Sequence, residues 1–350
     1  MDPTPLDAGS ASRVRALLPT LCDPDASFGE AHAAVQALHR ELAAVTGIVG
    51  IEDEATHGEG TRLPGGKAIS PAHAAQCLRE TTRTVKFLRG VESALRDLAA
   101  RVEGPVRVLY AGCGPYGTLL LPLAIRWPAE RLQVTLLDIH EQSLESALRV
   151  AEALGVADRV AGSVRTDAAT YRTEVPFHLA VSETLAQGLR NEPVLAILRN
   201  LWPQGAPGAV FLPERVVLSF VLVDMSRQMA LMTNCPEPVA RDHYPVVLDC
   251  GTVVEVSREA AEAWQEEPSW DGTGQAIRCP TLVWPADACP ERSAQLIARV
   301  HIHGGIVLEH RESSITHPWI PTWGRDARPG ARIAFQYVLG SRPEALGRLL

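Results

Sequence analysis

The sequence predicts an α/β fold: a parallel sheet with crossover helices, preceded by a helical N-terminal segment and followed by an antiparallel β region. Before residue 100, apolar residues recur at helical spacing. Strand-like and helix-like segments then alternate up to residue 201, which is typical of a parallel sheet. After Gly208, short β-type runs separated by Pro and Gly follow one another. We therefore expect three parts, at residues 1–103, 104–208 and 209–350, and the first part is expected to be a helical lid.

The N-terminal part contains two predicted helical segments. Residues 31–45 are rich in Ala, Leu and Glu, with apolar residues at helical spacing. Residues 47–66 are rich in glycine and charge, which predicts a loop or lid. Ser70 then provides an N-cap and Pro71 the first helical position, so we expect a helix from there that runs towards Leu98.

The middle part begins after the Gly104-Pro105 break. Strands are predicted at residues 106–111, 133–138, 160–166 and 177–182, and helices at 119–126, 143–154 and 193–201. In the C-terminal part, strands are predicted at residues 210–212, 216–224, 246–256, 281–284, 298–303, 305–309 and 333–338. Only the stretch near Ala260 has a helical pattern there.

Composition excludes several classes of function. The net charge of -8 argues against a nucleic-acid partner, because phosphate binding needs a basic surface. No apolar run could span a bilayer, and the N-terminus lacks the pattern of a secretory signal, so we expect a cytoplasmic protein. The 7 cysteines are scattered without a CxxC pair, which predicts reduced thiols and no metal site.

A cofactor motif follows the first strand of the middle part. Gly112 and Gly114 stand between a buried strand and a helix, where glycines let the backbone turn tightly and approach a ligand closely. Asp138 ends the next strand, and an acidic residue at that place can bind two ribose hydroxyls. The alternative is that Asp138 only caps the following helix.

The run Gly112-Cys113-Gly114-Pro115-Tyr116-Gly117 does not keep the GxGxxG spacing of dinucleotide-binding folds. It resembles the first motif of class I S-adenosylmethionine-dependent methyltransferases. That resemblance implies a Rossmann-like sheet and S-adenosylmethionine as cofactor.

The resemblance extends to other residues near the expected cofactor. It places Asp167, in TDAATY, beside the adenine ring, although an ordinary turn aspartate is the alternative. Tyr110 stands where the family carries an acidic residue; its ring could face the sulfonium or simply pack in the sheet. Ser182 is counted with the cofactor-binding residues and could also hydrogen-bond substrate.

The segment SETLAQGLRNEP carries Glu183 and Glu192 and resembles the double-glutamate hairpin of protein arginine methyltransferases. Two carboxylates can orient a cationic nitrogen towards a sulfonium methyl. The alternative is that Glu183 lies on a solvated helix flank and Glu192 only complements a helix dipole. The same relatives imply a possible homodimer.

Two further residues are catalytic candidates. His317, in SSITHPWIPTW, lies in a segment that resembles the Thr-His-Trp loop of the same enzymes with a proline inserted; it could act as a general base or be structural. Tyr171 follows Asp167 and could reach the reactive centre or pack on the sheet edge.

Pro115 opens a second interpretation, because GCGPYGTLLLPL also resembles the motif of nicotianamine-synthase-like enzymes. Among these, azetidine-2-carboxylate synthase lets the cofactor's own amine attack its γ-carbon and releases methylthioadenosine. Our first hypothesis is N-methylation of a small amine or guanidine, such as arginine, in specialised metabolism. Cyclisation is the second, and a cofactor-binding regulatory or scaffold protein without activity is the third.

Overall fold

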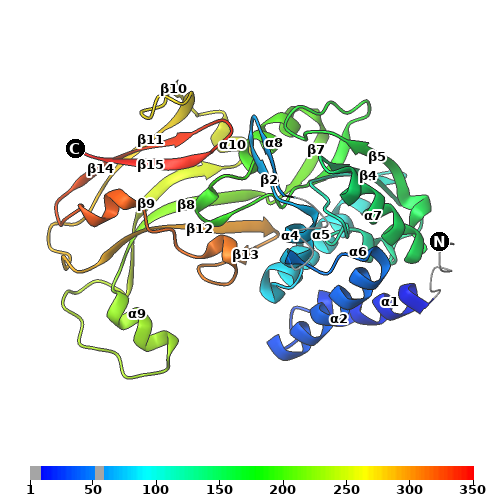
Figure 1. Cartoon of the computed structure of the whole chain (residues 1–350), viewed down its shortest axis with the longest axis horizontal. Coiled ribbons are helices and arrows are strands. Elements are labelled where there is room, and N and C mark those ends of the chain that lie inside the picture. Colours follow the sequence, from blue (N-terminus) through cyan, green and yellow to red (C-terminus); the bar gives the residue numbers. More distant parts are fainter. Residues whose placement is uncertain (1–8, 52–58) are drawn as a thin grey trace. The chain divides into compact units, whose positions relative to one another are not determined.

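The computed structural model describes residues 9–51 and 59–350, and the chain divides into two compact units (Figure 1). Unit 1 contains the described residues up to Thr184, together with 193–214 and 301–308. Unit 2 contains residues 185–192, 215–300 and 309–350. The chain therefore passes from one unit to the other several times.

Unit 1 is built around a five-stranded sheet of order β5-β4-β3-β6-β7, in which every neighbouring pair is parallel. The strands are β3 (Val106–Ala111), β4 (Leu132–Asp138), β5 (Val160–Arg165), β6 (Phe177–Val181) and β7 (Gly205–Leu212). β3 to β5 are added in one direction and β6 and β7 in the other, so the strand order reverses between β3 and β6. The predicted Rossmann-like sheet is confirmed.

Helices surround this sheet. They are α1 (Gly9–Cys22), α2 (Phe28–Thr46), α4 (Pro71–Cys77), α5 (Thr81–Ala99), α6 (Leu121–Ala124), α7 (Glu141–Ala153) and α8 (Val194–Leu201). α5 packs on β3, β6 and β7, α7 packs on β4 and β5, and α2 packs on both α5 and α7. α2 begins with a capping box between Ser27 and Glu30, which satisfies amide groups that a helix start leaves open.

The helix predicted from Ser70 to Leu98 is wrong in one respect, because it is two helices. Ser70 caps α4 and Pro71 is its first residue, as predicted. α4 ends at Cys77, however, and the hydroxyl of Thr84 donates to the carbonyl of Leu78 at 2.8 Å. A side chain thus satisfies a carbonyl that the helix would otherwise bond, and the extended backbone of Glu80 separates α5 from α4.

Two other N-terminal predictions change. Of the loop predicted at residues 47–66, residues 52–58 lie outside the described part of the chain. The following residues form a hairpin of β1 (Thr61–Leu63) and β2 (Gly66–Ala68). The helix predicted at 119–126 is the single turn of α6, with glycine and proline close to its start.

Unit 2 is rich in antiparallel strands. One sheet has the order β10-β11-β14-β15, and another has the order β13-β12-β8-β9, in which β13 and the end of β12 belong to unit 1. The strands are β8 (Arg215–Val223), β9 (Val247–Val256), β10 (Glu266–Pro268), β11 (Gln275–Val283), β12 (Ser293–His303), β13 (Ile306–Leu308), β14 (Arg332–Val338) and β15 (Glu344–Leu349). The predicted antiparallel region is confirmed.

The prediction that only the stretch near Ala260 is helical is wrong. α10 (Arg258–Ala261) lies there, but α9 (Met225–Met232) is a second helix, visible as the yellow-green helix beyond β8 in Figure 1. The carboxylate of Asp224 accepts a hydrogen bond from the amide of Arg227 and caps the start of α9.

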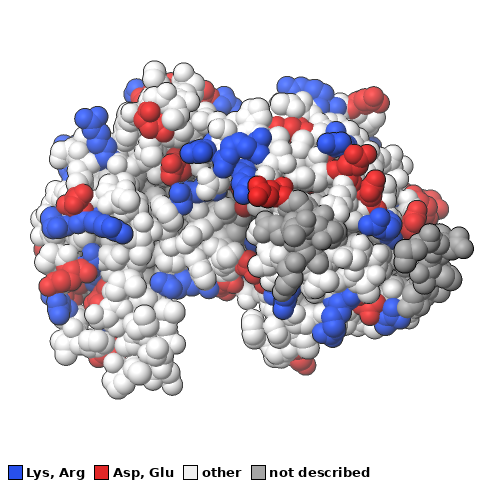
Figure 2. All heavy atoms as spheres, viewed as in Figure 1, with Lys and Arg blue, Asp and Glu red and all other residues white. Residues whose placement is uncertain are grey.

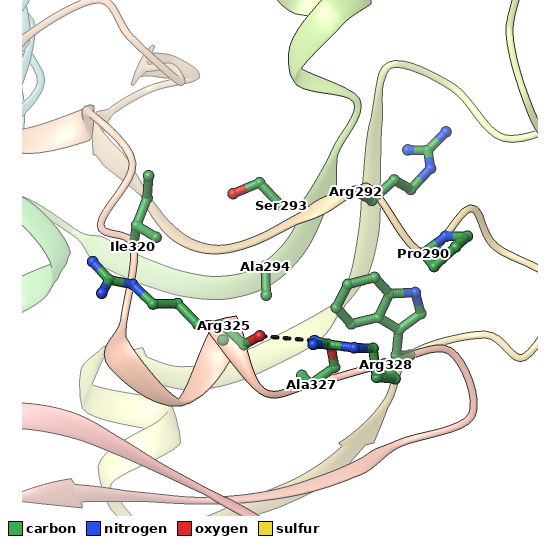
Figure 3. A pocket seen from close by; sticks show the side chains of 10 residues that line it. Pro290, Arg292, Ser293, Ala294, Ile320, Arg325, Ala327 and Arg328 are labelled. Carbon is green, nitrogen blue, oxygen red and sulfur yellow. Dashed lines mark hydrogen bonds between the residues drawn. The ribbon is translucent and has the colours of Figure 1, made fainter.

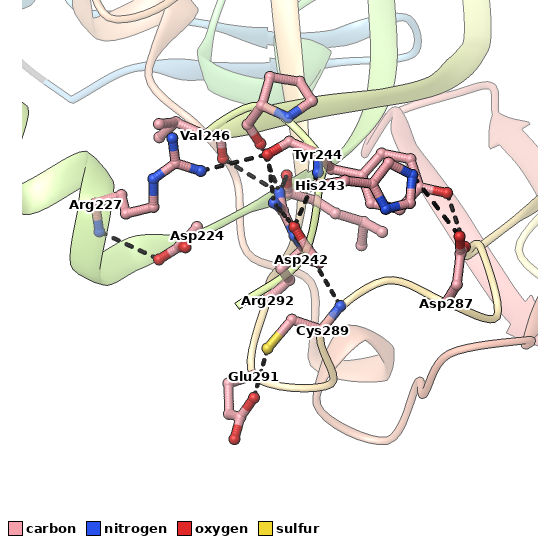
Figure 4. A network of polar contacts seen from close by, with 12 residues as sticks. Asp224, Arg227, Asp242, His243, Tyr244, Val246, Asp287, Cys289, Glu291 and Arg292 are labelled. Carbon is pink, nitrogen blue, oxygen red and sulfur yellow. Dashed lines mark hydrogen bonds and ion pairs between the residues drawn. The ribbon is translucent and has the colours of Figure 1, made fainter. Parts of the chain in front are cut away.

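Aromatic packing and a buried ion pair hold unit 2 together. Phe220, Trp323 and Phe335 form a cluster with ring centres 5.4–5.9 Å apart. Asp242 and Arg292 form the ion pair between two loops, with both side chains almost fully buried (Figure 4). These features give unit 2 a core of its own.

Charged side chains of both signs are spread over the surface of the protein. On the face shown in Figure 2, basic and acidic side chains are interspersed rather than gathered into one basic stripe. In the described residues, no helix is both long and apolar enough to cross a membrane.

Candidate functional site

The glycine-rich loop after β3 is closely packed within unit 1. Gly112 has φ +72° and Gly114 has φ +62°, values that favour glycine. A Cβ atom on Gly112 would lie 2.8 Å from the Cγ2 of Thr184, and one on Gly114 would lie 3.3 Å from the Cβ of Ala74. The loop therefore lies between the end of β6 and α4, and larger residues would not fit without a shift.

Asp138 joins the two predicted cofactor motifs. Its Oδ2 accepts a hydrogen bond from the amide of Gly114 at 2.9 Å, and its Oδ1 accepts one from the amide of His140, also at 2.9 Å. The residue is 8% exposed. An ionised carboxylate has about four acceptor positions, so Asp138 can bind ligand hydroxyls while it holds the loop.

Tyr110 occupies a buried place in β3. Its hydroxyl accepts a long hydrogen bond, 3.4 Å, from the amide of Leu119. Burial raises the pKa of this phenol, with the neighbouring Cys113 acting in the same direction. Tyr110 therefore stays neutral, and the position where the related motif has a carboxylate carries no charge here.

Glu183 lies two residues after the end of β6 and forms an ion pair with Arg83 of α5, with Oε1 and Nη2 2.5 Å apart. Both side chains are largely buried, at 14% and 7% exposed. Burial raises the pKa of Glu183, and the attraction of Arg83 lowers it by less. On its other side, Arg83 pairs with Glu80 at 3.3 Å.

Arg83 is the residue that sequence reasoning missed. It lies in the first turn of α5, next to the break that the sequence analysis overlooked. Burial is the largest single effect and lowers the pKa of Arg83, but Glu183, Cys77 and Glu80 together outweigh it, so this pKa lies well above its ordinary value. Recognition of the break after Cys77 would have placed Arg83 at a helix start, although not beside Glu183.

Ser182 and Thr184 flank Glu183. Ser182 is fully buried, its amide donates to the carbonyl of Leu212 in β7, and its hydroxyl lies 3.1 Å from that of Thr184. The backbone before Glu183 is thus bonded to β7, and the side chain of Thr184 after it packs against Gly112. The role of Ser182 in binding the cofactor stays a prediction.

Asp167 and Tyr171 form a turn after β5. The Oδ1 of Asp167 accepts from the amide of Ala169 at 2.9 Å, and its carbonyl accepts from the amide of Tyr171 at 3.1 Å. The carbonyl of Tyr171 in turn accepts from the side chains of Asn200 and Gln204. The turn matches the alternative in which Asp167 is an ordinary turn aspartate, although the Oδ2 of Asp167 takes no part in these bonds. The roles of Asp167 beside the adenine and of Tyr171 near the reactive centre stay predictions.

The end of α2 covers part of the glycine-rich loop in unit 1. The hydroxyl of Tyr116 donates to the carbonyl of Ile48, which follows α2. The ring of His39 meets that of Tyr116 edge-on, with centres 6.0 Å apart. The helical N-terminal part therefore contacts the loop that carries the cofactor motif.

Glu192 and His317 belong to unit 2, whereas Glu183 belongs to unit 1. Within unit 2, the segments around Glu192 and His317 lie together, since the side-chain amide of Gln187 donates to the carbonyl of Pro318 at 2.7 Å. His317 is exposed and Glu192 is half-buried. The clamp by Glu183 and Glu192 and the general-base role of His317 stay predictions.

Unit 2 also contains a cavity of about 200 Å³. It is lined by Trp284, Pro290, Arg292, Ser293, Ala294, Ile320, Gly324, Arg325, Ala327 and Arg328 (Figure 3). Arginines line it and carboxylates do not, so it does not suit a cationic acceptor. Within residues 9–51 and 59–350, no cluster of His, Cys, Asp or Glu could hold a metal ion.

No protein-family model matches this sequence, and no curated protein matches it. Among solved structures, the chain is similar to a Trypanosoma brucei PRMT1 enzyme-prozyme heterotetramer with AdoHcy, at 14% identity and a TM-score of 0.48, covering 79% of this chain and 92% of that chain. It is also similar to an Arabidopsis thaliana protein arginine methyltransferase 10, at 11% identity and a TM-score of 0.46. This match covers 76% of this chain and 87% of that chain.

A third similar structure is a Thiobacillus denitrificans SAM-dependent methyltransferase with S-adenosyl-L-homocysteine, at 25% identity and a TM-score of 0.27, covering 41% of this chain and 56% of that chain. All three TM-scores are below 0.5.

Proposed function

We propose that this chain is an S-adenosylmethionine-dependent methyltransferase that methylates a nitrogen of a small amine or guanidine, such as arginine. The observation that carries the proposal is the place of Gly112 and Glu183. They follow β3 and β6, the two strands between which the strand order reverses. In open parallel sheets, ligands bind at that point, beyond the carboxyl ends of the strands.

The residues of unit 1 fit the cofactor. The absence of side chains at Gly112 and Gly114 leaves backbone that a ligand can approach closely, and any Cβ there would meet neighbouring atoms. Asp138 would bind the ribose hydroxyls, with Asp167 near the adenine and Ser182 and Tyr110 near the rest of the cofactor. The buried guanidinium of Arg83 pairs with both Glu183 and Glu80, so it would hold the Glu183 carboxylate in place beside the bound cofactor.

The bound cofactor supplies a methyl group activated by a sulfonium. Glu183 would hold the acceptor nitrogen by a charge-assisted hydrogen bond, with Glu192 as the second carboxylate of the clamp. S-adenosylmethionine would supply its methyl group to that nitrogen and leave as S-adenosylhomocysteine, and the nitrogen would release a proton. Positioning provides most of the acceleration in such a displacement. Tyr171 and His317 remain candidates to line the acceptor and accept the proton.

Burial supports the role of Glu183. A carboxylate with little exposure binds a cation more strongly than one in water. To bind a cation, Glu183 must be ionised. The charge of Arg83 favours this form, whereas burial disfavours it. The contact between Ile48 and Tyr116 supports a lid that excludes water. We further propose a small acceptor from specialised metabolism, a cytoplasmic location and a homodimer.

A second candidate is favoured by Tyr110. Because this buried phenol is neutral, it cannot hold the cofactor's ammonium as a carboxylate would. An amine that is less stabilised as a cation is more available to attack the cofactor's own γ-carbon, as in azetidine-2-carboxylate synthesis. That reaction needs no acceptor and releases methylthioadenosine.

The proposal is tested by incubating the protein with S-adenosylmethionine and a panel of amines and guanidines that includes arginine. We expect S-adenosylhomocysteine to form with at least one acceptor. Glu183→Gln should lower that rate at least tenfold, while Glu141→Gln, which changes an exposed carboxylate on α7, should leave it unchanged. Cofactor binding without turnover on the whole panel would support a regulatory protein instead.

A further inference from the structure

The backbone before Glu192 has an unusual conformation. Gly188 has φ +67°, Leu189 has φ +54° and Asn191 has φ +66°. Left-handed backbone is unfavourable for a residue such as Leu, and it persists only where the surroundings hold it in place. The segment 187–191 is therefore held by contacts within unit 2.

Two hydrogen bonds fix this segment to the sheet that contains β14 and β15. The hydroxyl of Tyr337, which is fully buried, donates to the carbonyl of Leu189 at 2.6 Å. The amide of Asn191 donates to the carbonyl of Pro343 at 2.8 Å. Leu189 and Asn191, the two residues other than glycine with positive φ in this segment, are thus each bonded through their own backbone.

A third contact holds the same segment: the side chain of Arg190 stacks on the ring of Trp319. The guanidinium carbon of Arg190 lies 3.6 Å from the centre of the Trp319 ring, a distance suited to a cation–π interaction. The Nε of Arg190 pairs with the carboxylate of Glu344 at 3.3 Å. A Cβ on Gly188 would lie 3.0 Å from the Cβ of Trp319, so the ring also packs tightly on the segment.

We propose that Arg190 is a positioning residue that holds the strained segment 187–191 by stacking on Trp319. Because Glu192 directly follows this segment, Arg190 also fixes the orientation of the Glu192 side chain. The catalytic consequence rests on the proposed function, since it needs Glu192 to bind the acceptor. A planar guanidinium can stack on the ring and bond Glu344 at the same time, which lysine does less well.

The physical part is tested by hydrogen exchange in the full-length chain, which needs no substrate. In the wild type, the amides of Leu189 and Asn191, which donate to the carbonyls of Ala186 and Pro343, should be protected. Arg190→Gln and Trp319→Leu should each speed their exchange by about 3- to 30-fold, the range that loss of one cation–π contact allows. Amides of β14 should not change, which would exclude global unfolding as the cause.

Matched variants separate stacking from charge. Trp319→Phe keeps a ring and Arg190→Lys keeps a cation, so both should restore part of the protection. Arg241→Gln removes an exposed arginine of unit 2 and should change nothing. Because the two residues act through one contact, the double variant Arg190→Gln/Trp319→Leu should exceed either single variant only slightly. Unprotected amides in the wild type, or additive effects, would overturn the proposal.

The catalytic part is tested with S-adenosylmethionine and L-arginine. Arg190→Gln should raise the KM for arginine by about 3- to 30-fold and leave the Kd for the cofactor unchanged, with Arg190→Lys between it and the wild type. Unchanged KM in a variant with faster exchange would overturn the positioning role. If the wild type methylates no acceptor, the proposed function fails, while the exchange result still decides whether Arg190 holds the segment.

Discussion

Replacing Asp242 by asparagine removes one charge from the buried ion pair that joins two loops of unit 2 (Figure 4). The Oδ1 of Asp242 lies 2.7 Å from Nη2 of Arg292, and its Oδ2 lies 2.8 Å from Nε. The side chains are 4% and 1% exposed. In the variant, the amide NH2 of the new side chain would face an N–H of Arg292, so two donors would meet. The guanidinium charge would also stay buried without its counter-charge.

Breaking a buried pair in this way costs about 3–5 kcal/mol. At an unfolding entropy of about 2.1 cal/mol/K per residue, this lowers the Tm of a chain of 350 residues by roughly 4–7 °C. Thermal and urea unfolding of the full chain measure it, and Glu309→Gln is the control, since it breaks an exposed pair with Arg299 worth at most about 1 kcal/mol. A loss below about 1 kcal/mol for Asp242→Asn would refute the reasoning.

The same pair predicts a dependence on pH. Hydrogen bonds from Arg292 hold the pKa of Asp242 below its ordinary value of 3.8. A carboxyl whose pKa is lowered by folding stabilises the fold above its ordinary pKa, and this contribution is lost as the pH falls below that value. Unfolding free energy should therefore fall more steeply below pH 3.8 in the wild type than in Asp242→Asn.

Three further predictions concern the candidate site. Asp138→Ala should weaken S-adenosylmethionine binding in calorimetry by at least tenfold, because it removes the acceptor for the Gly114 amide and for the ribose; an unchanged Kd would exclude this role. Gly112→Ala should lower the Tm and the cofactor affinity more than Gly155→Ala does, since both have positive φ but only the Cβ at Gly112 meets another atom. The acid limb of kcat/KM should lie above the ordinary glutamate range, because burial raises the pKa of Glu183; Glu183→Gln should remove that limb.

The sheet of unit 1 was predictable because its signals are local. The apolar run from Val106 to Ala111 and the Gly-rich turn after it mark β3 without reference to any other segment. The position of Asp138 at a strand end likewise follows from its own neighbours, and parallel strands bring such ends to one edge.

The features that were missed depend on contacts between distant residues or on a single cap. Arg83 meets Glu183 across 100 residues of sequence, so no spacing rule could pair them. The break before α5 depends on one hydroxyl, that of Thr84, which the helical pattern conceals. α9 begins at Met225, and its N-cap Asp224, which directly follows β8, was the available signal.

The central claim is methyl transfer from S-adenosylmethionine, and the products of the cofactor test it most directly. The protein is incubated with S-adenosylmethionine, once alone and once with the amine and guanidine panel, and the products are analysed by mass spectrometry. We predict an unchanged cofactor in the first sample and S-adenosylhomocysteine with a methylated acceptor in the second. Methylthioadenosine formed without any acceptor would contradict the claim and establish cyclisation instead.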